Sequence, residues 1–370
     1  MNKISILLPN LNGGGAEKVS VDLARAFNFL GYKVEFVLMQ AIGDFLPDVR
    51  RDYTVVDLGV YKIRDVPWSF ARYLRSRHPT AIIANMWPLT SAAVIGRCLS
   101  GKKCTLLLVE HCTLSQQYMG WGTLHKHIMR LSMATTYRFA DCLAAVSEGA
   151  AKDNAKLSGL PEHRVAVLHN PIPCRSMPTT DACSMAKAFW NCPQGERILT
   201  VGSLKEQKNH PALLRAFARL PRPHARLMLL GQGGKEAELR TLAIELGIND
   251  RVIFAGFHTD PSPFYATSDL FVLSSDNEGL PTVLVEALSF GLPVVSTDCP
   301  FGPAEILENG RWGRLVPVGN VNALAKAMDE SLSVPADGNA LKRRAADFLP
   351  EIAACKYLDL FKLPYDLGAK

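Results

Sequence analysis

Short apolar runs alternate with amphipathic stretches along almost the whole chain, as serial strand–helix units do. The apolar runs predict strands in the first half at 4–8, 33–39, 81–85, 105–109, 142–146 and 165–168. The alternation restarts with predicted strands at 197–201, 226–230, 251–254, 270–273, 293–296 and 313–317. Helical spacing of apolar residues predicts helices between strands, including 16–30, 211–220, 235–246, 281–290 and 321–332. This order predicts parallel sheets with helices on both faces.

A proline-rich stretch separates the two runs, with prolines at 171, 173, 178 and 193. We therefore predict an α/β protein with two doubly wound, Rossmann-like domains facing across a cleft. The predicted parts are an N-terminal domain at 1–170, a linker at 171–194, a C-terminal domain at 195–348 and a helical tail at 349–370 that crosses back to the N-terminal domain. Ligands of such sheets bind beyond the carboxyl ends of the strands, so the cleft is the expected site.

Composition agrees with two globular domains, since 48% of the 370 residues are hydrophobic and 21% are charged. The first apolar run is too short for a signal peptide, and no apolar stretch is long enough to span a bilayer. The nine cysteines are an odd number without a Cys-x-x-Cys pair, which suits reduced thiols rather than disulfides or a zinc site. These features predict a cytoplasmic location.

The net charge of +6 is unevenly placed. Residues 1–175 hold 21 Lys and Arg against 13 Asp and Glu, whereas residues 176–370 hold 20 against 22. The basic residues of the first half cluster at 72–77, 97–103 and 126–138. Such clusters attract anionic lipid headgroups or a polyprenyl diphosphate, although a solvated basic surface gives the same pattern. The sequence has no basic motif of a nucleic-acid-binding module, so no nucleic-acid partner is expected.

Two glutamates in the second half give the most specific chemical signal. Glu278 is predicted in a loop after the strand at 270–273, and Glu286 in the second turn of the following helix. Pro281 suits a helix start, where free N–H groups of residues 279–282 form a site for an anion. Carboxylates on both sides of an anion site suit a ligand with hydroxyls at both ends and phosphate between them, such as a nucleotide sugar. A solvated Glu and a helix-face Glu around an ordinary turn would look the same.

Two glycine-containing loops each follow the first predicted strand of a domain. Residues 12–17 (Asn-Gly-Gly-Gly-Ala-Glu) open the first helix and suit close approach to a phosphate, or a plain tight turn. They are not a dinucleotide fingerprint, because position 18 is Lys18. Residues 202–210 place Lys208 just before a helix, where its ammonium group could reach a diphosphate. A surface lysine is the alternative interpretation.

His111 follows Glu110 at the end of the strand at 105–109, on the predicted cleft edge of the first sheet. It could bond a sugar hydroxyl, although a lone histidine at a strand end is more often structural. Asn85 and Ser147 have the same ambiguity. His125 and His127 lack an evident third ligand, so no metal site is expected.

Several motifs appear together and in order, and they resemble one family. They are Gly14-Gly15-Ala16-Glu17, Glu110-His111, Asn170-Pro171-Ile172, Val201-Gly202-Ser203-Leu204 with Gln207-Lys208-Asn209, Glu278-Gly279-Leu280-Pro281 to Glu286, and Gly302-Pro303-Ala304-Glu305 with Gly313-Arg314-Leu315-Val316-Pro317. The chain resembles retaining glycosyltransferases of family four (glycosyl transferases group 1), which have the GT-B fold. It is most similar in style to bacterial enzymes that assemble lipid-linked or surface oligosaccharides.

The resemblance implies a role for each matching position. Catalysis would depend on His111 near the transferred sugar, Lys208 at the donor diphosphate and Glu278 at the sugar hydroxyls. Glu286 would bind the ribose hydroxyls. The remaining donor-binding positions would be Gly14, Gly15, Ser203, Gly279, Leu280, Pro281 and Thr282. Many relatives have Arg where this chain has Ser203, so one of two diphosphate cations is missing, and Lys205 or an arginine elsewhere would have to compensate.

These features lead to one expected function. We expect a metal-independent, cofactor-free transferase that moves a hexose or N-acetylhexosamine from a nucleoside diphosphate sugar, UDP-sugar favoured, to a glycan or polyprenyl-diphosphate-linked acceptor. The acceptor would bind the N-terminal domain, which would lie peripherally on the anionic inner face of the bacterial inner membrane. A GDP-mannose-dependent transferase, a nucleotide-sugar epimerase and a non-catalytic sugar-nucleotide-binding protein remain as alternatives.

Overall fold

The computed structural model describes residues 2–12, 15–173, 175–191, 194–278, 280–300 and 302–366. The chain forms two compact units, the first comprising residues up to Pro173 together with those from Leu349 onward, and the second Cys174–Phe348. Each unit contains one sheet in which the strand pairs are parallel. None of the described helices is long and apolar enough to cross a bilayer.

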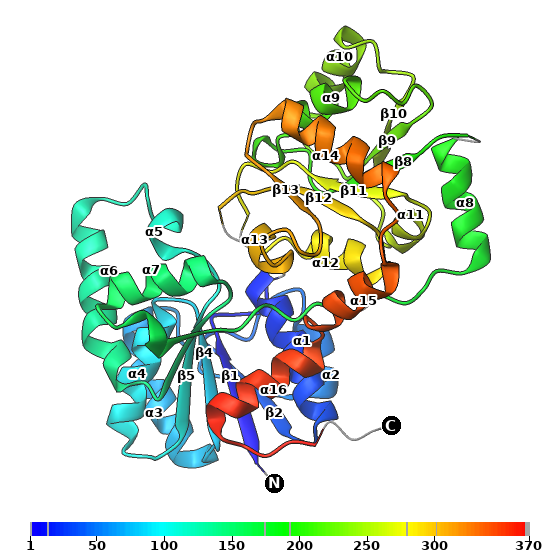
Figure 1. Ribbon diagram of the computed structural model, residues 1–370. Helices are drawn as coiled ribbons and strands as arrows, with labels where there is room; N and C mark the ends of the chain where they lie inside the picture. Colours follow the sequence, from blue (N-terminus) through cyan, green and yellow to red (C-terminus); the bar gives the residue numbers. More distant parts are fainter. Residues whose placement is uncertain are drawn as a thin grey trace. The chain divides into compact units, whose positions relative to one another are not determined.

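Unit 1 is built on a seven-stranded sheet with the order β3-β2-β1-β4-β5-β6-β7 (Figure 1). Its strands are β1 (Lys3–Leu8), β2 (Lys33–Leu38), β3 (Thr54–Asp57), β4 (Ala81–Asn85), β5 (Thr105–Glu110), β6 (Cys142–Ala145) and β7 (Val165–Val167). Its α-helices are α1 (Gly15–Phe29), α2 (Leu46–Asp52), α3 (Val66–Arg77), α4 (Leu89–Ser100), α5 (Leu114–Gln117), α6 (Thr123–Thr136), α7 (Glu148–Ser158) and α16 (Pro350–Phe361). Single 3-10 turns lie at Ile63–Asp65, Tyr137–Phe139 and Glu162–Arg164.

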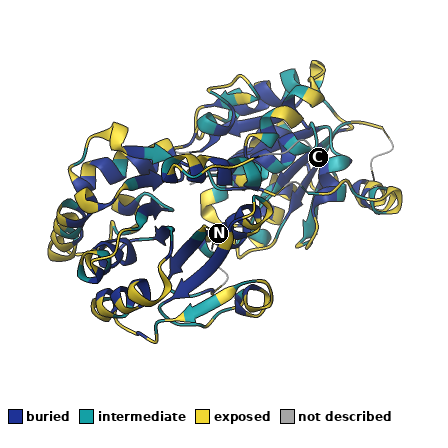
Figure 2. Ribbon diagram, turned by 90° about the horizontal axis from the view of Figure 1, so that it is seen from below, coloured by how far each residue is buried: buried dark blue, intermediate teal, exposed yellow. Residues whose placement is uncertain are grey.

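The strands of unit 1 are apolar throughout because both faces of the sheet are covered. Along β4, Ile82 packs into a core with α3, α4, α6 and α7, whereas Ile83 packs into the opposite core with α1, α2 and α16. Figure 2 shows the sheet as a buried layer and the outer helix faces as exposed. Helix α16, from the end of the chain, packs on α1, with the Phe27 and Tyr357 rings in edge contact at 6.1 Å.

Unit 2 contains a six-stranded sheet with the order β10-β9-β8-β11-β12-β13. Its strands are β8 (Arg197–Val201), β9 (Arg226–Leu230), β10 (Val252–Gly256), β11 (Leu270–Leu273), β12 (Val294–Thr297) and β13 (Arg314–Val316). Its helices are α8 (Thr180–Trp190), the 3-10 turn η4 (Glu206–Lys208), α9 (His210–Ala218), α10 (Glu236–Glu245), α11 (Ser262–Ala266), α12 (Thr282–Ser289), α13 (Pro303–Ile306), α14 (Val321–Ser333) and α15 (Gly338–Ala346).

Strand β3 and helix α8 were not expected from the sequence, and the short helices α11 and α13 were not predicted either. Strand β3 is a short edge strand with only half-buried central valines, so its apolar signal is weak. Helix α8 lies inside the stretch interpreted as a linker. Thr179 caps it by accepting a hydrogen bond from Ala182 N–H, and Trp190 is buried at its end. Pro171, Pro173 and Pro178 lie before the helix, so they do not interrupt it.

Each sheet reverses its strand order at one point, and crevices for ligands form there. In unit 1 the reversal lies between β1 and β4, and in unit 2 between β8 and β11. The loops that leave these strands contain most of the residues that the sequence singles out. The fold therefore brings together loops that are about 70 residues apart in the chain.

Candidate functional site

The loops after β8 and β11 are joined by several hydrogen bonds. Gln207 Nε2 donates to the Asn277 carbonyl at 2.8 Å, and Asn209 Nδ2 donates to Asp276 Oδ1 at 2.6 Å. Asn209 also caps α9 by accepting from Ala212 N–H. These bonds hold both loops at the reversal point of the unit 2 sheet.

Lys208 and Glu278 meet between these two loops. Lys208 Nζ lies 2.6 Å from Glu278 Oε1, and the two side chains are only 18% and 9% exposed. Ser275 Oγ donates to the same carboxylate oxygen at 2.6 Å. Low exposure reduces solvent screening, so each charge strongly affects a polar ligand placed beside it. The sequence proposed a cation and a carboxylate for one ligand, and the structure places the two in contact.

A glycine allows the neighbouring loop to approach this site closely. Gly231, after β9, has φ of +150°, and a Cβ atom there would lie 2.0 Å from the Gly202 carbonyl oxygen. Leu204 N–H donates to the Gln232 carbonyl at 3.0 Å, which fixes the backbone around Ser203. Lys205 points elsewhere, into a separate hollow of about 220 Å³ that it lines with Arg215 and Lys235.

Glu286 lies in the second turn of α12, as the sequence predicts for this helix. Its side chain is 15% exposed, and Arg175 Nη2 contacts its Oε1 at 3.2 Å. Buried Tyr265 lies beside it: burial, followed by the charge of Glu286, raises the pKa of Tyr265 well above its usual range. Helix α12 begins at Thr282, with Pro281 at its N-cap and Leu280 before it, while Gly279 lies outside the described residues.

His111 lies at the end of β5 in unit 1, where Nε2 and Asn85 Oδ1 are 2.8 Å apart. Asn85 Nδ2 donates to the Leu7 carbonyl, so Asn85 Oδ1 accepts and His111 Nε2 carries the proton. Burial lowers the pKa of His111 to about 4, which keeps the ring neutral at pH 7. Nδ1 is then an acceptor, and it is buried without a partner among the described residues.

His111 lines a cavity of about 610 Å³ at the reversal point of the unit 1 sheet. The cavity wall includes Gly15, Glu17, Trp87 and Tyr118, and it is largely apolar and aromatic. No Lys or Arg is among the described residues that line it. Gly15 begins α1, whereas Gly14 lies outside the described residues. This chemistry suits a neutral, partly apolar group such as a sugar ring.

Two family models match the chain over nearly its whole length. Residues 13–175 match Glycosyltransferase Family 4, and residues 190–348 match Glycosyl transferases group 1. The chain belongs to the family-four glycosyltransferases. It is therefore an enzyme, and the two sheets with their covering helices form the GT-B fold.

This glycosyltransferase is similar to proteins of bacterial glycan assembly. It is 27% identical, over 93% of its own length and 94% of the relative's, to the N-acetylgalactosamine-N,N'-diacetylbacillosaminyl-diphospho-undecaprenol 4-alpha-N-acetylgalactosaminyltransferase of Campylobacter jejuni. Its fold matches that of the lipopolysaccharide outer core galactosyltransferase WaaB, with a TM-score of 0.78, 20% identity and coverage of 98% and 99% of the two chains. Anabaena HepE, solved in complex with UDP, matches with a TM-score of 0.72, 20% identity and coverage of 98% and 96%.

The structure adds residues to the site that the sequence did not identify. Arg175 lies in the proline-rich stretch, and no motif marks it. Trp87 and Tyr118 line the unit 1 cavity but precede or follow strand ends without a recognisable spacing. Tyr265 lies in an apolar stretch that is typical of a buried core segment, so its sequence context did not mark it. Asn85 differs from these residues, because the sequence already marked it as a polar residue at the end of a strand.

Glu110 organises the wall of the unit 1 cavity. Its carboxylate is fully buried and accepts from Trp87 N–H at 3.0 Å, from Thr90 Oγ1 at 3.1 Å and from Tyr137 OH at 2.6 Å. Burial raises its pKa from 4.5 to about 7, and the three hydrogen bonds oppose that rise. Glu110 therefore holds a proton in the folded state over a pH range in which the unfolded chain has lost it.

We expect Glu110→Gln to remove a pH dependence of stability. Below pH 4.5 the folded and unfolded states both bind the proton, and as pH rises through 7 the stabilisation due to its uptake is lost. For the shift from 4.5 to about 7 the loss is on the order of 3 kcal/mol. The free energies of unfolding of both proteins are measured in urea at pH 5 and pH 8. From pH 5 to pH 8 the parent should lose about that much more stability than Glu110→Gln. An unchanged difference between the two proteins would contradict a protonated Glu110.

Proposed function

We propose that this glycosyltransferase moves a hexose or N-acetylhexosamine from a nucleoside diphosphate sugar, with UDP-sugar as the first candidate, to a glycan or polyprenyl-diphosphate-linked glycan. The pairing of Lys208 with Glu278 carries the proposal, because it offers a cation for a diphosphate beside an acceptor for sugar hydroxyls. The names of the relatives support it: one acts on a diphospho-undecaprenol-linked sugar, and another was solved with UDP. The product would enter bacterial surface polysaccharide.

The donor assignment places each chemical group of a nucleotide sugar on unit 2. Lys208 would contact the diphosphate, together with the amides at the start of α12 and the hydroxyl of Ser203. Glu278 would accept from sugar hydroxyls and Glu286 from ribose hydroxyls. When the diphosphate binds, Lys208 would pair with the diphosphate instead of with Glu278. Glu278 Oε1 would then be available to the sugar hydroxyls. The ion pair is thus compatible with binding of the donor.

For the reaction we propose transfer with retention of the α-configuration. The bond between the anomeric carbon and the diphosphate oxygen breaks, and the acceptor oxygen bonds to that carbon on the same face. The acceptor's proton passes to the departing diphosphate, so no enzyme nucleophile is required. Negative charge grows on the diphosphate as its bond breaks, and Lys208 and the α12 amides would stabilise that charge. His111 Nδ1 would accept a hydrogen bond from a hydroxyl of the transferred sugar.

The donor assignment is tested with purified enzyme and a panel of nucleotide sugars in the presence of EDTA. We expect one UDP-sugar to raise the melting temperature and to support transfer that EDTA does not abolish, since Lys208 and amides meet the diphosphate charge. Activity that EDTA abolishes and magnesium or manganese restores would refute metal independence. If only a GDP-sugar bound, the donor base would be guanine and the UDP assignment would be wrong. Interconversion of the donor without any acceptor would indicate an epimerase, and binding without reaction a non-catalytic protein.

We further propose that α6 attaches the enzyme to an anionic membrane surface. Leu124, Ile128 and Leu131 lie on one side of this helix and are 68%, 52% and 66% exposed. Arg130 on the same helix is also exposed. Residues 111–140 contain no Asp or Glu, so a negative surface meets no repulsion there. Met119 and Trp121, just before this helix, are exposed as well, whereas Met129 is buried in the core and cannot contribute to this surface.

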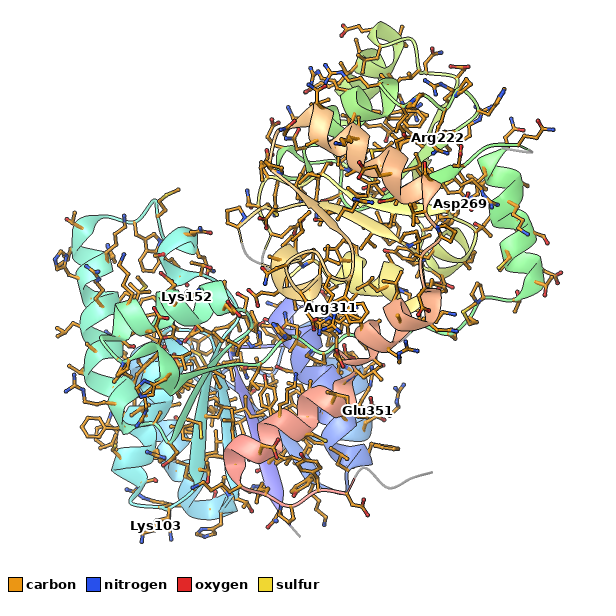
Figure 3. The ribbon with its side chains drawn as sticks, in the orientation of Figure 1. Lys103, Lys152, Arg222, Asp269, Arg311 and Glu351 are labelled. Atoms are coloured by element: carbon orange, nitrogen blue, oxygen red, sulfur yellow. The ribbon has the colours of Figure 1, made fainter. Side chains whose placement is uncertain are left out.

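Two of the three basic clusters of unit 1 adjoin each other, since Arg75 donates to the Leu99 and Ser100 carbonyls. Lys103 lies two residues before β5, at the amino-terminal edge of the sheet (Figure 3), whereas His111 follows the carboxyl end of the same strand. Arg97 is engaged by Asp141 and by the Phe139 carbonyl. The surface of α6 is therefore the better candidate, because its basic and apolar residues lie on one element.

We expect vesicles rich in anionic lipid to bind the enzyme at low salt and to release it at high salt. Each well-placed basic residue contributes about 1 kcal/mol, and the apolar stripe adds burial that salt does not weaken. The triple variant Leu124→Gln, Ile128→Gln, Leu131→Gln should lose most vesicle binding while its activity on a short soluble acceptor persists. Absence of binding by the parent to anionic vesicles at low salt would favour a soluble acceptor instead.

A further inference from the structure

Arg175 is the first described residue of unit 2, and it reaches two carboxylates from the start of the proline-rich stretch. Its Nη2 lies 3.2 Å from Glu286 Oε1, and its Nη1 lies 3.7 Å from Asp260 Oδ1. Asp260 follows β10, and Glu286 belongs to α12. The guanidinium group is thus held at both ends by residues from different elements, which restricts its rotation and that of the carboxylate it contacts.

The contact with Arg175 can orient the Glu286 carboxylate in addition to balancing its charge. The Glu286 side chain is mostly buried, Arg175 contacts it, and its charge acts on the buried Tyr265 hydroxyl. An ionised carboxylate accepts about four hydrogen bonds. The contact with Arg175 therefore leaves enough acceptor capacity for a pair of hydroxyl groups, and it restricts the orientation of the carboxylate.

The arrangement also carries a cost that packing alone does not explain. Arg175 Nε is buried and has no hydrogen-bond partner among the described residues. A buried donor without a hydrogen-bond partner destabilises the folded state. Arg222 in the same unit, in contrast, contacts Glu196, Asp329 and Ser333, as an arginine with a structural role does. The comparison favours a function for Arg175 beyond joining its segment to unit 2.

We propose that Arg175 is a positioning residue for ribose recognition: it holds Glu286 so that the carboxylate receives the 2′- and 3′-hydroxyls of the donor nucleotide. This inference rests on the proposed role of Glu286. It makes selectivity for ribose over 2′-deoxyribose a property of the Arg175–Glu286 pair rather than of Glu286 alone. The residue lies outside every motif that identifies the family in this sequence.

The test compares the affinities of UDP and 2′-deoxy-UDP for the full-length enzyme by calorimetry. A hydrogen bond from the 2′-hydroxyl to a carboxylate should make the parent bind UDP about 10- to 100-fold more tightly than 2′-deoxy-UDP. Glu286→Ala should bring this ratio close to one. Arg175→Ala should reduce it to about threefold or less, and Arg175→Lys should retain part of it, since an ammonium group keeps the charge but not the fixed fork.

Arg197→Ala is the matched control. Arg197 pairs with Asp269, which is labelled in Figure 3, at 3.1 Å, and its side chain is about as exposed as that of Arg175. This variant should lose a comparable, partly buried ion pair without changing the ribose ratio. Melting curves on all variants confirm folding, and Arg175→Lys keeps the test valid if the alanine variant is unstable.

The outcomes separate the inference from the function on which it rests. A parental ratio in Arg175→Ala, together with a lost ratio in Glu286→Ala, would overturn the positioning role while leaving the ribose role of Glu286 intact. Tighter UDP binding by Arg175→Ala would mean that Arg175 competes with ribose, which also overturns it. A parental ratio in Glu286→Ala would remove the ribose assignment itself, and a parent that binds neither nucleotide would remove the UDP assignment.

Discussion

Lys208→Ala is expected to lower the rate of sugar transfer by about 10²- to 10³-fold, which is the usual effect of removing one group that stabilises a developing negative charge. The Lys208 side chain is 18% exposed and lies between the two loops at the reversal point of the unit 2 sheet. Little solvent is therefore available to replace its charge on the departing diphosphate. Because the charge grows during bond breaking, kcat should fall more than UDP affinity.

Steady-state kinetics and UDP titrations on the same preparation measure both quantities. Lys205→Ala is the control, since Lys205 is exposed and three positions away in the same loop. Lys208→Ala leaves Glu278 with its hydrogen bond from Ser275, so the loop keeps one of its contacts, and a melting curve checks the fold. A Lys208→Ala enzyme with kcat within about threefold of the parent would rule out the assigned role.

His111→Ala is expected to reduce transfer by about 10- to 100-fold while UDP affinity stays close to that of the parent. The reason is that His111 lies in the cavity of unit 1 with Nδ1 as an unused buried acceptor, whereas the groups assigned to the nucleotide belong to unit 2. His163→Ala, at an exposed histidine of the same unit, is the matched control. Transfer at the parental rate would reduce His111 to a structural strand-end residue.

The dependence of the transfer rate on pH gives a second test of His111. Burial lowers the pKa of His111 to about 4, so the ring should stay neutral well below the usual histidine range. The folded protein binds this proton less readily than the unfolded chain, so stability due to the neutral ring is lost as pH falls from 6.5 towards 4. A contribution of His111 to the rate should therefore show no step near pH 6.5. A step there that His111→Ala removes would contradict a buried neutral ring.

The apolar pattern by itself determined the α/β class, because strands buried on both faces need continuous apolar runs and the helices between them need an apolar face. The same pattern indicated the two-sheet organisation, and the ordered motifs from Gly15 to Glu286 identified the family. The apolar pattern did not predict β3, whose valines are only half-buried. It also did not predict α8, because the prolines around this helix suggested a linker. In both cases the local signal was weak, and tertiary contacts decided the structure.

The site was only partly readable from the chain. Polar residues at strand ends were recognisable individually because parallel strands present their carboxyl ends at one edge. Which of them meet depended on strand order: β11 lies next to β8, so Glu278 contacts Lys208 although 70 positions separate them. Arg175 carried no sequence signal, because a guanidinium group can reach carboxylates more than 80 positions away only after the sheet has formed. The sequence determined which groups are present, and the tertiary structure decided their partners, burial and protonation.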